Sequence, residues 1–205
     1  MRFVAIALTA ALLSGCAITE DKILVRYTAP ANISVADGAS AVTLQIVSVD
    51  GRVANRDRVA TKKNGYGMEM AKIVASNDVV REVGDAVQAE LSSLGFKIGP
   101  GQLLITVETT DFYNDFKPGL FSADAVAQVS FNLSAKTAKG DLLYSRVYKA
   151  VGFNNGVAIM GGSQALVALQ AALRDAVQQM VTDGDLHRAL VKGGRAQQAQ
   201  ATPTS

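Results

Sequence analysis

Residues 123–135 read ADAVAQVSFNLSA and alternate between two kinds of side chain. Apolar residues, centred on Val129 and Phe131, occupy every second position, and mostly polar residues lie between them. Such alternation predicts a strand with one packed face and one polar face. A Lys-Gly pair marks a turn, and residues 142–151 return as an antiparallel partner. On this second strand we expect Tyr144, Arg146 and Tyr148 on the more open face, with Leu143, Val147 and Val151 inward.

Two segments carry the apolar stripe of an amphipathic helix. Residues 77–94 and 163–180 each place apolar side chains at spacings of 3, 4, 4 and 3 residues, which is one helical face. Asp78 and Ser163 are residue types suited to cap the two N-termini, and Asp183 is suited to cap a short final helix.

Two further strands complete the predicted fold, at residues 42–49 and 103–107. The element order is then β-α-β-β-β-α. Two helices with one apolar stripe each must cover an antiparallel sheet of about four strands, most simply on a single face. The predicted fold class is therefore α+β, a two-layer sandwich.

The N-terminus reads as an export signal. Residues 3–13 form an apolar run of 11 residues, which is shorter than the about 20 residues of a transmembrane helix and fits the h-region of a signal peptide. The run ends in Leu13, Ser14, Gly15 and Cys16, which resemble the lipobox of bacterial lipoproteins. The resemblance implies cleavage before Cys16 and its acylation by fatty acids such as palmitate. A plain secretory signal with an incidental cysteine is the alternative.

This signal sets the expected domain layout. Residues 1–15 are removed, 16–40 are an acylated anchor and flexible tether, 41–192 form a single domain, and 193–205 are a disordered tail. Ala17 follows the cysteine, where an aspartate would favour retention in the inner membrane of enterobacteria. We therefore expect the outer membrane, periplasmic face, with the periplasmic face of the inner membrane as the alternative.

Positive charge is densest in residues 51–67. Only Asp57 opposes five cations there, which are Arg52, Arg56, Arg58, Lys62 and Lys63. Such a run is typical of segments attracted to anionic lipid headgroups or lipopolysaccharide. A solvated, mobile loop is the favoured interpretation, because no apolar stripe accompanies the charges as membrane insertion would require.

Aromatic residues concentrate in residues 111–121, which hold Phe112, Tyr113, Phe116 and Phe121. In a loop between strands they are candidate anchors for a binding partner; the alternative is that they plug the end of the sandwich as core. Residues 153–162 are apolar and glycine-rich, which suits a mobile binding loop or a self-association strand.

Composition argues against several kinds of chemistry. The net charge is +2, and the 205 residues include one Cys and one His. These numbers give no reason to expect nucleic-acid binding, a disulfide framework or a Cys-cluster metal site. We expect no cofactor, no metal and no enzymatic activity. His187 is interpreted as a helix-end residue, and Glu82, Asp85 and Glu90 as a solvated helix face.

Several stretches beyond the lipobox form a recognisable pattern. They are the 79–94 helix with Leu94-Gly95-Phe96 and Gly99-Pro100, the 103–107 strand, the strand through Val129-Ser130-Phe131, and the C-terminal helix followed by Leu186-His187. On these stretches the chain resembles the YajG-like family of outer-membrane lipoproteins, over the lipobox and residues 40–191. The glycine-rich segment and the Gln-rich tail depart from the family pattern. The resemblance implies the fold and the envelope location, and it carries no active-site residue across.

The function expected from these features is an interaction or structural module of the cell envelope, anchored to the membrane through acylated Cys16. One alternative is an accessory protein that handles lipid or lipopolysaccharide, which requires an apolar groove beneath the helices. The other is a subunit of an oligomeric envelope assembly, formed by self-association through sheet edges.

Overall fold

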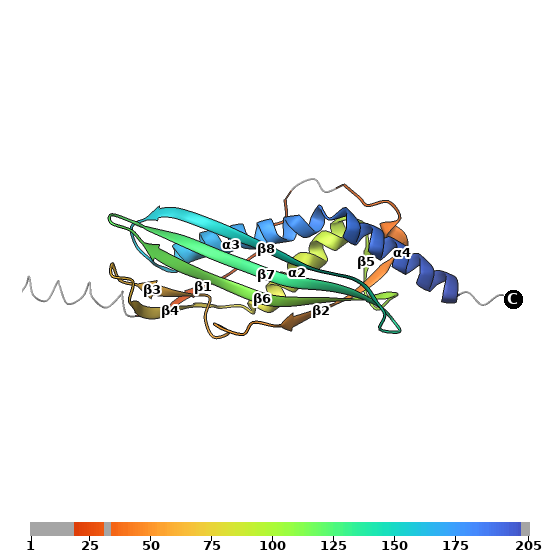
Figure 1. Cartoon of the computed structure of the whole chain (residues 1–205), viewed down its shortest axis with the longest axis horizontal. Helices are drawn as coiled ribbons and strands as arrows, with labels where there is room; N and C mark the ends of the chain where they lie inside the picture. The colour runs from red at the N-terminus through yellow and green to blue at the C-terminus, as the bar shows by residue number, and fades with distance from the viewer. Residues whose placement is uncertain (1–18, 31–33, 202–205) are drawn as a thin grey trace, which may run out of the picture.

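The computed structural model describes residues 19–30 and 34–201. The predicted signal peptide and Cys16 lie outside these residues. Within them, one sheet of eight strands and three α-helices form an elongated α+β molecule (Figure 1). The strands are β1 (Asp21–Ile23), β2 (Thr43–Asp50), β3 (Ala60–Lys63), β4 (Glu69–Ala75), β5 (Lys97–Ile98), β6 (Leu103–Pro118), β7 (Ala123–Thr137) and β8 (Leu142–Val157). The helices are α2 (Val79–Ser93), α3 (Gly162–Val181) and α4 (Gly184–Ala201), with a 3₁₀ turn, η2 (Ala39–Ala41).

Three long strands form one side of the sheet, with β8 at its edge. β6, β7 and β8 run antiparallel in sequence order, which confirms the predicted hairpin. The other edge of β6 is shared: β2 runs parallel along residues 103–109, and β3 meets β6 where Ala60 lies opposite Asn114. β4 joins β3, β1 joins β4, and β5 joins β2.

The predicted sheet had about four antiparallel strands, whereas the described part of the chain has eight in a mixed sheet. β2 and β6 are parallel because α2 carries the chain back along the sheet between them, and parallel neighbours need such a crossover. Of the four added strands, β1, β3 and β5 hold only 3, 4 and 2 residues, too few for a local alternation signal. The fourth, β4, holds 7 residues, EMAKIVA, whose polar and apolar side chains do not alternate.

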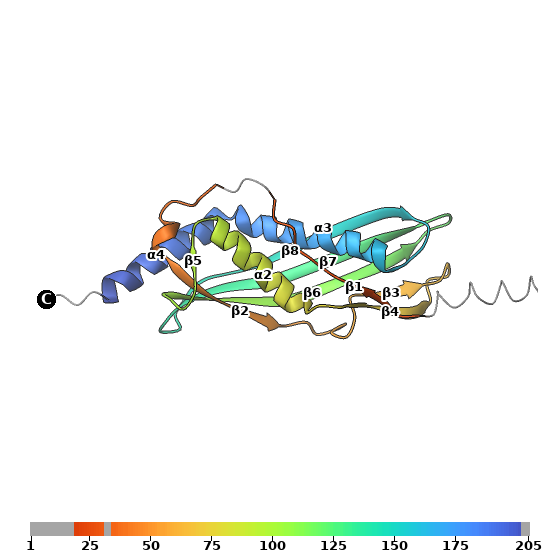
Figure 2. The ribbon, with the colours of Figure 1, turned by 180° about the vertical axis from the view of Figure 1, so that it is seen from behind.

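Helices α2 and α3 cover the same face of the sheet, as predicted (Figure 1, Figure 2). Their apolar stripes are buried, and Leu91 of α2 and Leu173 of α3 have no exposed surface. Asp78 caps α2 by accepting hydrogen bonds from the N–H groups of Val80 and Arg81. Ser163 does not cap α3, because that helix begins one residue earlier, after Gly161.

Leu143 of β8 packs against the core as predicted, but from residue 147 on the two faces are the reverse of the prediction. Tyr148 points inward and is buried, whereas Val147 and Val151 are exposed on the face without helices. The alternation of β8 is ambiguous in sequence because both faces carry large side chains. The inward position of Tyr148 is stabilised by a buried acceptor, since its hydroxyl donates to Asp183 at 2.8 Å.

The chain joins the domain well before residue 41, which corrects the prediction of a tether over residues 16–40. β1 pairs with β4, and the side chain of Asn77 then holds the next residues. Its Oδ1 accepts from the N–H of Val25 at 3.1 Å, and its Nδ2 donates to the carbonyl of Val25 at 2.8 Å. These bonds pair backbone groups that a free tether would leave to water.

Two carboxylates of α2 extend this docking. Tyr27 donates its hydroxyl to Oε1 of Glu90 at 2.6 Å and its N–H to Oε1 of Glu82 at 2.6 Å. Glu90 is fully buried, so the prediction that Glu82, Asp85 and Glu90 form one solvated face holds for Asp85 alone. The N-terminal segment covers the other two, which local periodicity does not reveal.

The C-terminal segment 193–205 was predicted to be disordered, yet α4 continues to Ala201 and only the residues after it lie outside the described part. Gly193 and Gly194 let the helix approach the body of the domain closely. A Cβ added to Gly194 would come within 2.6 Å of Val42. The segment therefore packs without apolar side chains of its own, which is why hydropathy alone indicates a tail.

Candidate functional site

The predicted cationic surface is paired within the protein. Arg52 is buried, and its Nε lies 2.9 Å from Asp50. Arg56 donates from Nε to the carbonyl of Arg52 at 2.6 Å, and Arg58 lies 3.4 Å from Glu69. These contacts stabilise the turn after β2, and of the three arginines only Arg56 keeps a largely exposed side chain, at 61%.

The two lysines of the run belong to β3 and clamp distant segments. Lys62 is buried, and its Nζ lies 2.7 Å from Asp21. The same carboxylate accepts from the N–H of Gly162 at 2.8 Å, so it joins β1, β3 and the start of α3. Burial raises the pKa of Asp21, but these bonds outweigh it and hold the pKa below its usual range. Lys63 pairs with Asp115. The prediction of a solvated loop therefore holds for residues 53–57, which are largely exposed, whereas residues 60–63 form the strand β3.

The aromatic candidates separate into two groups. Phe112 and Phe116 are buried on the inner face of β6, so they belong to the core and are not exposed anchors. Tyr113 lies on the outer face, where its hydroxyl is 3.1 Å from Oγ1 of Thr61. Phe121 lies in the turn after β6 and is 94% exposed. Of the four, only Phe121 is freely available to a partner.

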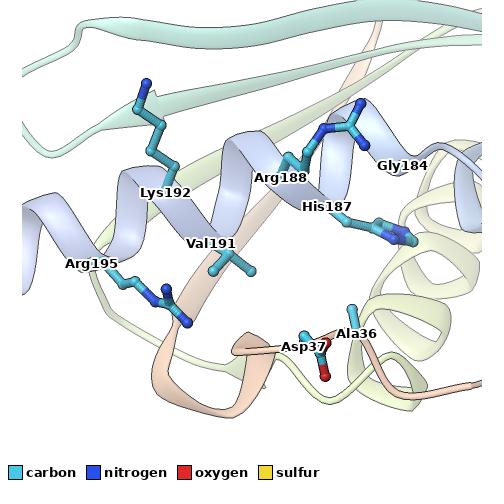
Figure 3. Close-up of a pocket in the computed structure, with 8 residues that line it drawn as sticks. All are labelled: Ala36, Asp37, Gly184, His187, Arg188, Val191, Lys192 and Arg195. Carbon is cyan, nitrogen blue, oxygen red and sulfur yellow. The ribbon is translucent and has the colours of Figure 1, made fainter.

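A groove of about 600 Å³ separates α4 from the N-terminal segment (Figure 3). Sequence analysis missed it, because its walls are far apart in the chain. Its lining is Ala36, Asp37, Gly184, His187, Arg188, Val191, Lys192 and Arg195. In Figure 3, Val191 and Arg195 face Asp37 across the groove, whereas Lys192 points away.

His187 lies in this groove, in the first turn of α4, so it is a helix-end residue as predicted, but a half-buried one. Its Nε2 is buried and has no hydrogen-bond partner within the described residues. Burial lowers the pKa of His187, against the opposing effect of the nearby Asp183 carboxylate. The imidazole ring of His187, the apolar side chain of Val191 and the charged groups of the lining, Asp37 against three cations, suit the groove to contact with a polar partner surface.

Asp183 is the most densely bonded carboxylate of the described chain. It caps α4, as predicted, by accepting from the N–H of Leu186 at 3.2 Å. It also accepts from the hydroxyls of Tyr144 and Tyr148 and pairs with Arg146, which sequence reasoning missed. Burial raises the pKa of Asp183, but these hydrogen bonds outweigh it and hold the pKa far below its ordinary value. The cluster is a structural joint between β8 and α4.

Residues 19–30 and 34–201 lack two other kinds of feature. No group of three or more His, Cys, Asp or Glu side chains gathers there as metal ligands would. None of the helices in this part of the chain combines the length and apolar content needed to cross a membrane.

Solved structures share the fold at low sequence identity. Protein XCC0632 from Xanthomonas campestris is 14% identical with a TM-score of 0.59, and the match covers 88% of this chain and 99% of that chain. An uncharacterized protein is 10% identical with a TM-score of 0.53, covering 80% and 97%. A minor lipoprotein from Acinetobacter baumannii is 8% identical with a TM-score of 0.45, covering 72% and 95%. The first two show a related fold.

Family membership comes from the sequence itself. Among curated proteins, none matches this chain. Residues 29–191 match the profile of the family Lipoprotein_16, which is described as uncharacterized lipoprotein. The match includes strands β2 to β8 and helices α2 and α3. The chain therefore belongs to this family of bacterial lipoproteins.

Proposed function

We propose that the protein is an outer-membrane lipoprotein of the YajG-like type, acylated on Cys16 and facing the periplasm. It acts by binding and not by catalysis, as an interaction or structural module of the cell envelope. Membership in a lipoprotein family supports this proposal, together with the lipobox at residues 13–16.

The observation that carries the proposal is the short chain between the anchor and the sheet. Thr19 is three residues after Cys16, and β1 begins at Asp21. A chain spans at most about 3.6 Å per residue, so the Cα atoms of Cys16 and Thr19 lie within about 11 Å of each other. Acyl chains on Cys16 therefore hold the domain at the membrane surface, with no long tether between. Confinement there raises the effective concentration for weak contacts with envelope partners.

The packing of α3 on β8 supports a binding module over a lipid carrier. A carrier with this fold needs an apolar groove beneath the helices. A Cβ added to Gly152 of β8 would lie 2.1 Å from the carbonyl oxygen of Ala168 and 2.5 Å from the nitrogen of Ala172. No acyl chain fits between two backbones in such close contact.

Cys16→Ser is expected to abolish acylation and cleavage before residue 16, because serine lacks the sulfur that receives the lipid. Incorporation of labelled palmitate and gel mobility of the precursor measure both steps. Ser14→Ala keeps the cysteine and a small residue before it, so this control should be processed normally. Palmitate labelling of Cys16→Ser at the wild-type level would refute the anchor.

Ala17→Asp is expected to shift the mature protein from the outer to the inner membrane of an enterobacterial host, because aspartate after the lipidated cysteine favours retention there. Density-gradient separation of the two membranes measures the shift, with Ala17→Ser as the control. Wild-type protein found in the inner-membrane fraction would overturn the outer-membrane assignment.

A further inference from the structure

Three turns meet at one end of the elongated molecule, the end opposite α4 (Figure 1, Figure 2). They are residues 64–68 between β3 and β4, 119–122 between β6 and β7, and 158–161 between β8 and α3. A cavity of about 490 Å³ is lined by the first and third turns. A second, of about 190 Å³, is lined by residues of all three. The turns therefore lie side by side, although they are far apart in sequence.

These turns expose large apolar and aromatic side chains to water. The apolar tip, as we name it, consists of Tyr66 (92% exposed), Met68 (58%), Leu120 (89%), Phe121 (94%) and Ile159 (74%). Large side chains gathered in this way, with nothing of the described chain covering them, mark a surface that contacts a membrane or another protein.

The tip is uncharged, and the opposite end of the sheet is not. None of the three turns contains Asp, Glu, Lys or Arg. The turn between β7 and β8, at the far end of the same strands, contains Lys139 and Asp141. Burying a charged group in hydrocarbon costs much more free energy than burying an uncharged side chain. Of the two ends of the sheet, only the tip is therefore suited to enter the boundary of a bilayer.

The path of the N-terminus favours lipid as the occupant of the tip. β1 runs parallel to β4, and β4 leads away from the turn at 64–68, so the N-terminal end of β1 points toward the tip. Asp21, the first residue of β1, lines the cavity between the turns at 64–68 and 158–161. Because Cys16 lies within about 11 Å of Thr19, its acyl chains enter the membrane beside this end of the domain.

We infer that the apolar tip is a second membrane contact, which dips into the same leaflet as the acyl chains of Cys16. The inference rests on the acylation of Cys16 proposed above. Tyr66 and Phe121 supply the aromatic groups that favour the interface between lipid and water. Two contacts fix an orientation that a single flexible anchor does not: the long axis stands away from the bilayer. The groove beside α4, at the other end, then faces the periplasm.

The experiment uses the full chain, expressed with its own signal and purified as the mature acylated protein. Acylation occupies the sulfur of Cys16, the one native cysteine, so a cysteine introduced elsewhere is the single free thiol. Phe121→Cys and Ile159→Cys carry an environment-sensitive fluorophore at the tip. Lys139→Cys is the matched control. It lies in the turn at the other end of β7, a strand of 15 residues that is about 45 Å long. The proteins are reconstituted into phosphatidylethanolamine–phosphatidylglycerol vesicles with and without spin-labelled lipid.

The expected result is a blue shift of emission and strong quenching by spin-labelled lipid at positions 121 and 159, with neither change at 139. Emission at the tip equal to that at 139 would overturn the inference, and so would a blue shift without lipid quenching, which indicates a protein contact. The intact mass of the purified protein separates the two proposals. Absence of acyl groups refutes the anchor, whereas an acylated protein with a water-exposed tip refutes only the second contact.

Discussion

Replacing Asp183 with alanine is expected to lower the free energy of unfolding by about 3 kcal/mol. Its carboxylate accepts hydrogen bonds from the hydroxyls of Tyr144 and Tyr148 and from the N–H groups of Asp185 and Leu186. Alanine removes the N-cap of α4, which costs about 1 kcal/mol. It also deprives two half-buried or buried hydroxyls of a charged acceptor, which costs about 2 kcal/mol more. Urea unfolding followed by circular dichroism measures the change.

A matched substitution and a change of pH test the assigned cause. Asp185→Ala removes the same charge two residues later from an exposed position, and it is expected to change stability by less than about 0.5 kcal/mol. Because the folded state lowers the pKa of Asp183, its contribution is present above its ordinary pKa of about 3.9 and is lost as the pH falls toward the folded value. The difference in the free energy of unfolding between wild type and Asp183→Ala should therefore become smaller below about pH 4. If this difference in stability stays constant as the pH falls below about 4, the ionised carboxylate is not the cause of the loss.

Gly152→Val is expected to cost about 3 kcal/mol or more, because α3 must move to admit a side chain. The first atom added would overlap the carbonyl oxygen of Ala168 and the nitrogen of Ala172, and neither backbone atom can rotate away. Thermal unfolding of the purified protein measures the loss. If the valine variant fails to accumulate, Gly152→Ala, which adds only the Cβ, gives a smaller loss that can still be measured.

The neighbouring residue provides the control for this substitution. Val151 is exposed on the face without helices, so Val151→Ala is expected to change stability by less than about 0.5 kcal/mol. Equal losses at positions 151 and 152 would show that β8 is sensitive to any substitution and that α3 does not lie against Gly152. Such a result would also remove the argument against an acyl chain binding between the helices and the sheet.

The helices and the central hairpin were predictable because their signals are local. The stripes of α2 and α3 and the alternation of β7 each lie within one element, and burial of those faces decides their structure. β6 was predicted only in its first part, because its register shifts between Thr109 and Asp111. Thr109 and Phe112 both point inward across this bulge, so the alternation changes phase there and the second half resembles a loop.

Partners that are distant in sequence explain what could not be predicted. Lys62 and Asp21 are far apart in the chain, as are Tyr27 and Glu90, so a local count of charges finds an unbalanced run and a solvated face. The apolar tip as a whole escapes sequence analysis for the same reason, although Phe121 and the apolar segment 153–162 were candidates singly. Each of its three turns supplies only one or two large side chains, and no single segment shows the stripe typical of membrane insertion.

The N-terminal residue of the mature protein shows whether Cys16 anchors this domain at the membrane. Mass spectrometry of the N-terminal peptide, taken from protein extracted from membranes, measures it. We expect a peptide that begins at Cys16 and carries fatty acyl groups on its sulfur. A peptide that begins at Met1, or one cleaved elsewhere with an unmodified Cys16, would refute the membrane anchor.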